Sequence, residues 1–202
     1  INKSLEKGGI RIIAFTRPGP PAGIFNTKRP IRTVADMKGL RMRALDAGQI
    51  ALYKAWGATG TIVSWREVPN ALQTGIAHGY INPAMAPLIF GHTGFIKHFT
   101  DAQAIIGGRV VLVSLNWYRA LSEQQRQLVT KAAQAATAEN LKWLKQAGPA
   151  QLERLEKAGI TVTRLDKATR ADFIARAQTV YTAGVLSAEQ LKLWTHAAAA
   201  TR

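Results

Sequence analysis

The sequence predicts an α/β fold, and three observations lead to this prediction. Between residues 36 and 83, short segments with the alternation of a strand are separated by segments with the spacing of a helix. Glycine or proline stands where most of these segments end. Further on, residues 110–113 form an unbroken apolar run, which is typical of a strand buried on both faces of a parallel or mixed sheet.

The chain before residue 36 predicts the tail of a helix, a strand and a loop. Residues 1–8 favour the helix tail, and residues 10–15 favour a buried strand that contains one arginine. Three prolines and two glycines in residues 16–23 predict a fixed loop. Thr33 has the position of a cap on a short helix, which Gly39 ends.

The stretch from residue 36 to residue 83 predicts three strands, each followed by a helix or a turn. The first, residues 40–44, alternates apolar and basic residues, and a helix follows at residues 49–56. The second, residues 61–63, leads into Ser64, which together with Glu67 has the spacing of a capping box. The third, residues 76–81, ends before a proline, which cannot donate to a strand ladder.

Arg43, Trp65 and Asn82 stand where these three strands end. Ligands of open α/β sheets bind beyond the carboxyl ends of the strands, so we predict that the three residues share one site. Each also has a plainer interpretation. Arg43 then lies on the surface of an edge strand, Trp65 belongs to the core, and Asn82 is only a turn residue.

The second half of the chain predicts a further strand and a long helix. Residues 110–115 favour a strand in the middle of the sheet, and Asn116 favours the cap of a short turn. A capping box at Ser122 predicts the start of a long amphipathic helix, which the Gly148-Pro149 pair should break or bend.

Shorter elements complete the predicted order. Residues 87–91 favour a helix, which a polar segment at residues 97–101 follows. Residues 160–165 favour a strand exposed on one face. Asp166 caps the next helix, and Ser187 opens the last one.

The composition sets limits on the class of protein. With 202 residues, of which 47% are hydrophobic, the chain can bury a core of one domain or two small ones. It has no cysteine, and no apolar run is long enough for a spanning helix. The net charge of +15 keeps open a nucleic-acid- or anionic-surface-binding protein as the alternative. The basic residues are spread over the whole chain, which favours a solvated surface and no nucleic-acid partner.

The sequence offers little that is typical of an enzyme. It has no glycine-rich phosphate loop before a helix and no nucleophile elbow. Its four histidines lack the spacing of metal ligands. We therefore predict no catalysis, no metal and no cofactor.

Three segments together resemble the TRAP-transporter solute-binding proteins of the DctP type. The segments are KRPIRT at residues 28–33, DMKGLRMR at residues 36–43 and EVPNALQTG at residues 67–75. The Asn82-Pro83 pair follows at the position that this family has for it. Later segments, at residues 110–114, 117–122 and 139–144, resemble the family's return through both of its lobes.

The resemblance implies a periplasmic protein that captures a small organic acid between two α/β lobes. It delivers the acid to the membrane subunits of a TRAP-type secondary transporter. In the family, an arginine at the position of Arg43 pairs with the ligand carboxylate, an aromatic residue near Trp65 packs on the ligand, and an asparagine at Asn82 donates to it. A guanidinium suits the first role because it offers a planar pair of donors. Arg17 and Tyr80 are further candidates for ligand contact.

The chain also departs from the family. Many members have a second arginine near the position of Gly23, so its absence favours a monocarboxylate ligand. Residue 1 matches the middle of the family, which implies that one lobe lacks its first half. We therefore expect weak or absent ligand binding by this chain, and self-association of the incomplete lobe.

The resemblance also implies how the chain divides. We expect a periplasmic-binding-protein-like fold with one near-complete lobe and part of a second, joined by crossing strands and a long helix. Residues 1–9 are then the helix tail of the incomplete lobe, residues 10–106 the near-complete ligand-binding lobe, residues 107–150 a crossing strand and long helix with part of the incomplete lobe, and residues 151–202 a return strand and the C-terminal helices.

Overall fold

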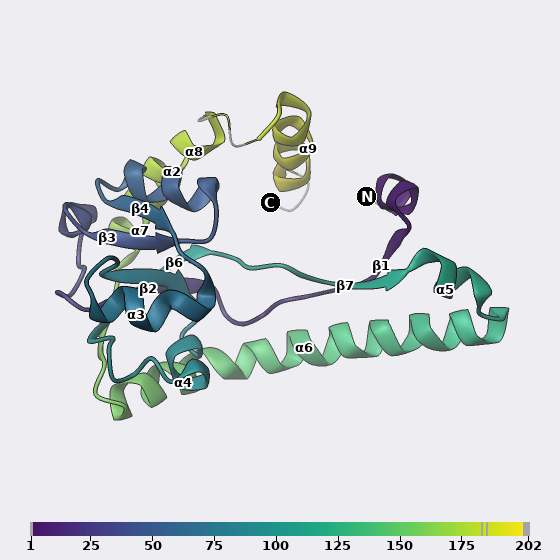
Figure 1. Cartoon of the computed structure of the whole chain (residues 1–202), viewed down its shortest axis with the longest axis horizontal. Helices are drawn as coiled ribbons and strands as arrows, with labels where there is room; N and C mark the ends of the chain where they lie inside the picture. The colour runs from purple at the N-terminus through teal and green to yellow at the C-terminus, as the bar shows by residue number, and fades with distance from the viewer. Residues whose placement is uncertain (1, 183, 185, 200–202) are drawn as a thin grey trace.

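A six-stranded mixed sheet forms the centre of the larger part of the molecule, at the left of Figure 1. The computed structural model describes residues 2–182, 184 and 186–199, and the strand order of this sheet is β4-β3-β5-β2-β6-β8. The strands are β2 (Ala22–Asn26), β3 (Arg41–Ala44), β4 (Thr59–Ile62), β5 (Gly79–Asn82), β6 (His98–Ile105) and β8 (Thr161–Arg164). Only β2 runs antiparallel to its neighbours among these strands. The predicted α/β class is confirmed.

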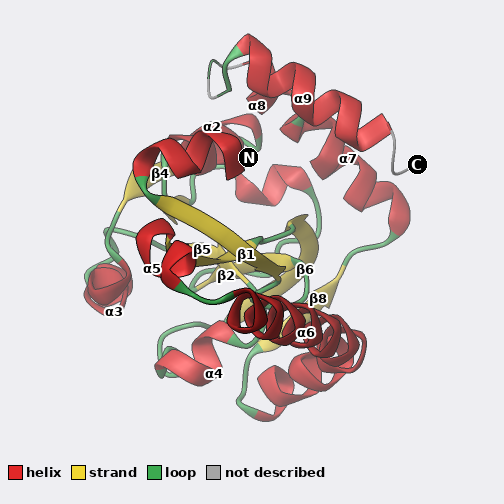
Figure 2. Ribbon diagram, turned by 90° about the vertical axis from the view of Figure 1, so that its right-hand side faces the viewer, coloured by secondary structure: helices red, strands yellow, loops and turns green. Residues whose placement is uncertain are grey.

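Helices cover both faces of this sheet, as Figure 2 shows. α2 and α7 lie on one face, where the Trp56 ring meets the edge of the Phe173 ring and its Nε1 donates to the Phe173 carbonyl oxygen at 3.0 Å. α3 and the end of α6 cover the other face through Leu72 and Leu155. The helices are α1 (Asn2–Leu5), α2 (Ala47–Ala55), α3 (Val68–Gln73), α4 (Ala86–Phe90), α5 (Leu115–Ala120), α6 (Glu123–Lys157), α7 (Lys167–Ala177), α8 (Thr179–Thr182) and α9 (Ala188–Ala199), with 3-10 turns at Glu6–Gly8, Val34–Met37 and Trp65–Glu67.

The alternation in β3 decides which face Arg43 occupies. Met42 and Ala44 pack into the cluster under α2 and α7. Arg43 stands opposite Tyr80 in the parallel pair β3–β5, and Tyr80 stands opposite Phe25 in β2. Residues that stand opposite each other in neighbouring strands point to the same face. Arg43 therefore shares the α3 face with Tyr80, as the sequence predicts.

Strand β7 (Arg109–Ser114) is not in the middle of a sheet, and this prediction was wrong. It pairs antiparallel with β1 (Ile10–Thr16) alone, in a two-stranded ribbon that extends away from the six-stranded sheet (Figure 1). Leu112 is 49% exposed and Phe15 is 55% exposed, and β1 buries only Ala14. The apolar residues of the ribbon thus have water, rather than helices, on much of their surface.

Helix α6 runs beneath the ribbon and reaches the six-stranded sheet (Figure 1). It stays helical through Gly148 and Pro149, so the pair does not break the helix, and the alternative that it bends the helix stays a prediction. The Asn140 side chain holds the loop after β1 to this helix, because it accepts from the Arg17 backbone N–H at 2.8 Å and donates to the Arg17 carbonyl oxygen at 3.0 Å.

Several predicted helix starts are confirmed, and some elements differ. Capping boxes stand at Thr33, Ser64 and Ser122, and the Asp166 side chain caps α7. The cap of α5 is Ser114 and not Asn116. Strands β2 and β6 were not predicted, although β2 lies inside the sheet and all five of its residues are buried.

The helix tail, the strand within residues 160–165 and the final helix are present where predicted, but the burial of β8 does not alternate between two faces. Ile1 and residues 200–202, at the ends of the predicted segments 1–9 and 151–202, lie outside the described residues. The predicted division at residues 9, 106 and 150 stays a prediction. Across the described part of the chain, no helix combines the length and the apolar character that crossing a membrane requires.

Candidate functional site

Arg43 is a buried cation at the carboxyl end of β3. The residue is 6% exposed, and its Nε donates to the Val63 carbonyl oxygen at 2.8 Å. No ion pair joins it to a carboxylate among the described residues. Burial lowers its pKa from the ordinary value, because the charged form loses hydration. A buried guanidinium without an anionic partner is unfavourable, so the site favours an anion.

Trp65 lies against Arg43. The Ser64–Glu67 capping box opens the 3-10 turn that carries Trp65, and this fixes the backbone at the start of α3. The Arg43 guanidinium carbon lies 5.4 Å from the centre of a Trp65 ring, within the range of a cation–π contact. The structure thus brings together the first two predicted site residues.

Tyr80 and His92 lie behind Trp65. The Trp65 ring is 5.4 Å from the Tyr80 ring and 5.0 Å from the His92 ring. Tyr80 is 0% exposed and His92 is 3% exposed, and the Tyr80 hydroxyl lies 3.2 Å from His92 Nδ1. Burial raises the pKa of Tyr80 and lowers the pKa of His92, so both are neutral at pH 7. The structure places Tyr80 inside the wall of the site, with its hydroxyl already engaged.

Asn82 is the last residue of β5, two positions beyond Tyr80 and on the same face. It stands opposite Gly23 in the β2–β5 pair and is partly buried. Among the described residues, no hydrogen bond engages its side-chain amide. The amide is therefore available to a ligand at the same strand end.

Arg17 lies in the loop after β1, which approaches Pro83 through Gly19. Its backbone is held by Asn140, and its Nε and Nη2 atoms are buried without a hydrogen-bond partner. Within the described part of the chain, no hydrogen bond, ion pair or ring contact joins it to Arg43, Trp65 or Asn82. The structure does not bring Arg17 into the cluster that the other predicted residues form.

Gly23 has no room for a side chain. A Cβ atom there would lie 2.4 Å from the Phe99 ring and 2.5 Å from the Thr100 carbonyl oxygen. This is the position near which the resemblance places a second arginine. No second guanidinium can therefore project from Gly23 beside Arg43, and the other arginine of β3, Arg41, is held at the opposite end of the strand by the Gly75 carbonyl.

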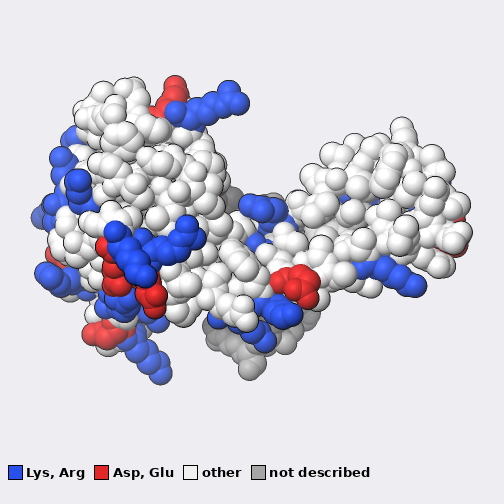
Figure 3. Space-filling model, turned by 90° about the horizontal axis from the view of Figure 1, so that it is seen from below, with Lys and Arg blue, Asp and Glu red and all other residues white. Residues whose placement is uncertain are grey.

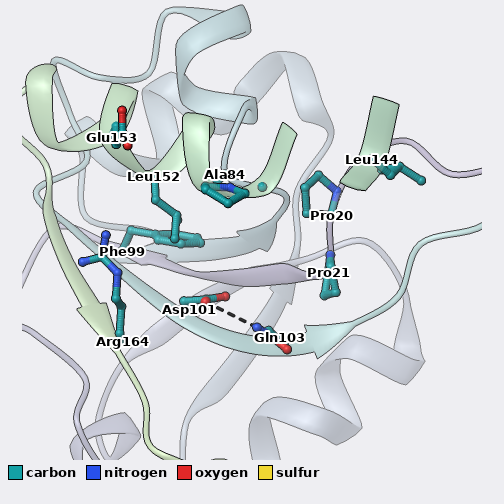
Figure 4. A pocket seen from close by; sticks show the side chains of 12 residues that line it. Pro20, Pro21, Ala84, Phe99, Asp101, Gln103, Leu144, Leu152, Glu153 and Arg164 are labelled. Carbon is teal, nitrogen blue, oxygen red and sulfur yellow. Dashed lines mark hydrogen bonds between the residues drawn. The ribbon is translucent and has the colours of Figure 1, made fainter. Parts of the chain in front are cut away.

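A separate cavity of about 480 Å³ lies between α6 and the sheet (Figure 4). Apolar side chains such as Phe99 and Leu152 line it, together with Asp101 and Arg164. Gln103 donates weakly to Asp101 at 3.4 Å, and Arg164 pairs with Glu156 at 2.9 Å. None of Arg43, Trp65 and Asn82 lines this cavity, and Arg43, unlike Arg164, has no ion pair with a carboxylate among the described residues. We therefore place the candidate site at the strand ends.

Two aromatic members of the site were missed from the sequence. His92 and Phe90 lie at the end of α4, and the Phe90 ring meets the Trp65 ring edge-on at 5.2 Å. Their distance from Arg43 in sequence hides this contact, and no motif marks them.

Among the described residues, no cluster of three or more potential ligand side chains can hold a metal ion.

The family model described as bacterial extracellular solute-binding protein, family 7 (DctP) matches residues 1–186. The ectoine-binding periplasmic protein TeaA of Halomonas elongata is 31% identical over 160 residues, which are 78% of this chain and 47% of TeaA. The ectoine/5-hydroxyectoine-binding periplasmic protein UehA of Ruegeria pomeroyi is 30% identical over 139 residues, which are 66% of this chain and 40% of UehA. The chain thus spans less than half the length of these two relatives.

Solved structures agree with these matches. The periplasmic ectoine-binding protein of the TeaABC TRAP transporter superimposes with a TM-score of 0.82 at 27% identity, over 95% of this chain and 64% of that one. A TRAP periplasmic solute-binding protein from Ochrobacterium anthropi with bound L-fuconate gives a TM-score of 0.82 at 25% identity, over 95% and 63% of the two chains. With its mixed sheet, its long helix and these matches, the chain belongs to the DctP family of bacterial extracellular solute-binding proteins, as the resemblance predicts.

Proposed function

We propose that this protein binds a small organic acid and that Arg43 pairs with its carboxylate. The observation that carries this proposal is the buried guanidinium without an anionic partner at a strand end. Its Nε is engaged by the Val63 carbonyl, and no described residue bonds to the two Nη groups. Two parallel N–H donors match the two oxygens of a carboxylate.

Asn82 and Trp65 complete the proposed contacts. The Asn82 amide offers a neutral donor from the neighbouring strand, and the Trp65 ring offers an apolar surface beside the charge. Relatives of this chain are named as binding proteins for ectoine, 5-hydroxyectoine and sialic acid, and each of these names specifies a small solute. The family consists of binding proteins, and we propose that this chain likewise catalyses no reaction and needs no cofactor.

The same family membership supports the proposed place and partner. Curated relatives are periplasmic, and the TeaA structure is of a component of a TRAP transporter. We propose that the protein acts in the periplasm and passes its acid to the membrane subunits of such a transporter. For the wall formed by Arg43, Trp65 and Asn82 we expect millimolar affinity, a Kd on the order of 1 mM.

The experiment is a calorimetric titration of the 202-residue chain with acetate at concentrations up to about one hundred times that Kd. Arg43→Ala should lose the binding, whereas Arg66→Ala, which removes the same charge from an exposed residue of the Trp65 turn, should retain it. Equal binding by the wild type and Arg43→Ala would contradict the proposal, and so would the absence of any acetate binding by the wild type.

The net charge of +15 does not by itself indicate a nucleic-acid partner, because the charge is not concentrated in one place. On the face shown in Figure 3, Lys and Arg side chains are dispersed over the sheet-bearing part and along the extension, instead of gathering in one patch. DNA binding that falls steeply with added salt would support the nucleic-acid alternative, and no binding at low salt would end it.

A further inference from the structure

The surface beside Arg43 is aromatic, and we infer that the site prefers a carboxylate that carries a flat apolar group over a polyhydroxylated acid. This inference rests on the proposed function, since it takes Arg43 as the carboxylate anchor. It adds the chemical class of the rest of the ligand.

Trp65 is the centre of the aromatic surface. Four groups surround it: the Arg43 guanidinium at 5.4 Å, the Tyr80 ring at 5.4 Å, the Phe90 ring at 5.2 Å and the His92 ring at 5.0 Å. Tyr80 and Phe90 both meet Trp65 edge-on, at interplanar angles of 77° and 81°. Edge-on packing with these two rings fixes the plane of the Trp65 ring next to the charge.

The polar atoms of this surface are mostly occupied. The Tyr80 hydroxyl is engaged with His92 Nδ1 in a buried pair, and Arg43 Nε is engaged with the Val63 carbonyl. The Ser64 hydroxyl donates to the Glu67 carboxylate at 2.6 Å. A ligand rich in hydroxyl groups would lose hydration here and gain few hydrogen bonds, which is unfavourable.

The outer part of the surface is apolar and reaches water. Phe90 is 54% exposed, although its ring packs on Trp65. A flat apolar group that extends from a carboxylate on Arg43 would cover this ring and remove apolar area from water, which is favourable. Gly23 adds to the argument, since a second guanidinium cannot project from that position toward a second carboxylate.

The test compares four probes on the 202-residue chain: phenylacetate, acetate, D-glucuronate and the neutral phenylacetamide. We expect phenylacetate to bind about threefold to tenfold tighter than acetate, the gain that an aromatic contact supplies. D-Glucuronate should bind no tighter than acetate, and phenylacetamide should bind more weakly than phenylacetate.

Two matched variants test the surface itself. Phe90→Ala removes an exposed ring and should reduce the advantage of phenylacetate over acetate by at least twofold. Ile89→Ala truncates the neighbouring residue of α4, which is 59% exposed, and should leave that advantage as it is. An unchanged advantage in Phe90→Ala would overturn the inference.

The remaining outcomes separate the two proposals. If D-glucuronate binds as tightly as phenylacetate, the aromatic preference is wrong while the carboxylate anchor is decided by Arg43→Ala. If phenylacetamide binds as tightly as phenylacetate, the carboxylate contributes nothing and the proposed function fails. If none of the three acids binds, the proposed function itself fails, and this inference fails with it.

Discussion

Substitution of Gly23 by alanine should destabilise the protein strongly, although alanine is the smallest residue that adds a side chain. Gly23 is not among the residues with a positive φ, so the reason is space rather than backbone conformation. The new Cβ would lie 2.4 Å from two atoms of the Phe99 ring and 2.5 Å from the Thr100 carbonyl oxygen. Both neighbours lie on β6, inside the sheet.

The structure sets the size of the effect. Ordinary contact begins near 3.4 Å, so the Phe99 ring would have to move by about 1 Å, which is the difference between 3.4 and 2.4 Å. The ring is held at 4.4 Å from Phe25, and the Thr100 oxygen is backbone that cannot rotate away. Overpacking of a core costs about 1–3 kcal/mol, and this site should reach about 3 kcal/mol. For a chain of this length, the melting temperature should fall by about 6–12 °C.

The assay is thermal unfolding followed by circular dichroism. Gly94→Ala is the matched control, because no atom lies within 4 Å of its Cβ and it has no positive φ. Its melting temperature should stay within about 2 °C of that of the wild type, because surface substitutions usually change the free energy of unfolding very little. Equal melting temperatures for Gly23→Ala and Gly94→Ala would refute the claim that β2 has no room for a side chain at Gly23.

Three further predictions concern other parts of the molecule. Burial lowers the pKa of His92, so the unfolded state takes up a proton at a higher pH than the folded state, and the free energy of unfolding should fall from pH 7.5 to pH 5.5. His92→Gln should flatten this slope in urea titrations, and a slope equal to that of the wild type would contradict the prediction. Asn140→Ala removes two hydrogen bonds to the Arg17 backbone and should lower the free energy of unfolding, measured in urea, by roughly 1–3 kcal/mol. An unchanged urea concentration at the midpoint of unfolding would show that these hydrogen bonds do not stabilise the protein. The exposed apolar residues of the β1–β7 ribbon should cause the protein to self-associate, so that the mass measured by sedimentation rises above 22.0 kDa as the protein concentration increases. Leu112→Lys should reduce this self-association, and a wild-type protein that stays monomeric at all concentrations would disprove the prediction.

The helix starts were predictable from the sequence because a cap depends on a few neighbouring residues. Ser64 and Ser122 each bind the backbone or side chain three positions further on, and both capping boxes are confirmed. The strand pairing was not predictable in this way. The apolar run of β7 shows a tendency to be buried, but it carries no information on its partner, and the actual partner is the single strand β1.

Strand β2 was missed because its neighbourhood reads as a loop. Prolines precede it, and its buried residues include Gly23 and Asn26, which are not typical of a strand. Asn26 has a structural reason, because its side chain accepts from the backbone of Lys28 and donates to the carbonyl of Arg29. Long-range pairing with β5 and β6 decides the conformation of this segment.

The site was predictable only in part. Because strand exits gather at one edge of a sheet, Arg43, Trp65 and Asn82 could be assigned to one region, and the structure places Arg43 against Trp65. Phe90 ends a later helix and His92 follows it in the next turn, and only the fold brings their rings to Trp65. The lack of space at Gly23 also follows from a neighbouring strand, and so no sequence pattern could reveal it.

The most direct test of the central claim is a nuclear magnetic resonance titration of the Arg43 side chain with phenylacetate, in protein labelled with nitrogen-15. The Arg43 Nε–H signal is assigned by its loss in Arg43→Lys. A carboxylate that pairs with the guanidinium should shift this signal and the Nη signals in a saturable way, with one Kd shared by the Trp65 indole signal. If the Trp65 signal shifts while the Arg43 signals stay unchanged, or if neither responds, Arg43 is not the carboxylate anchor.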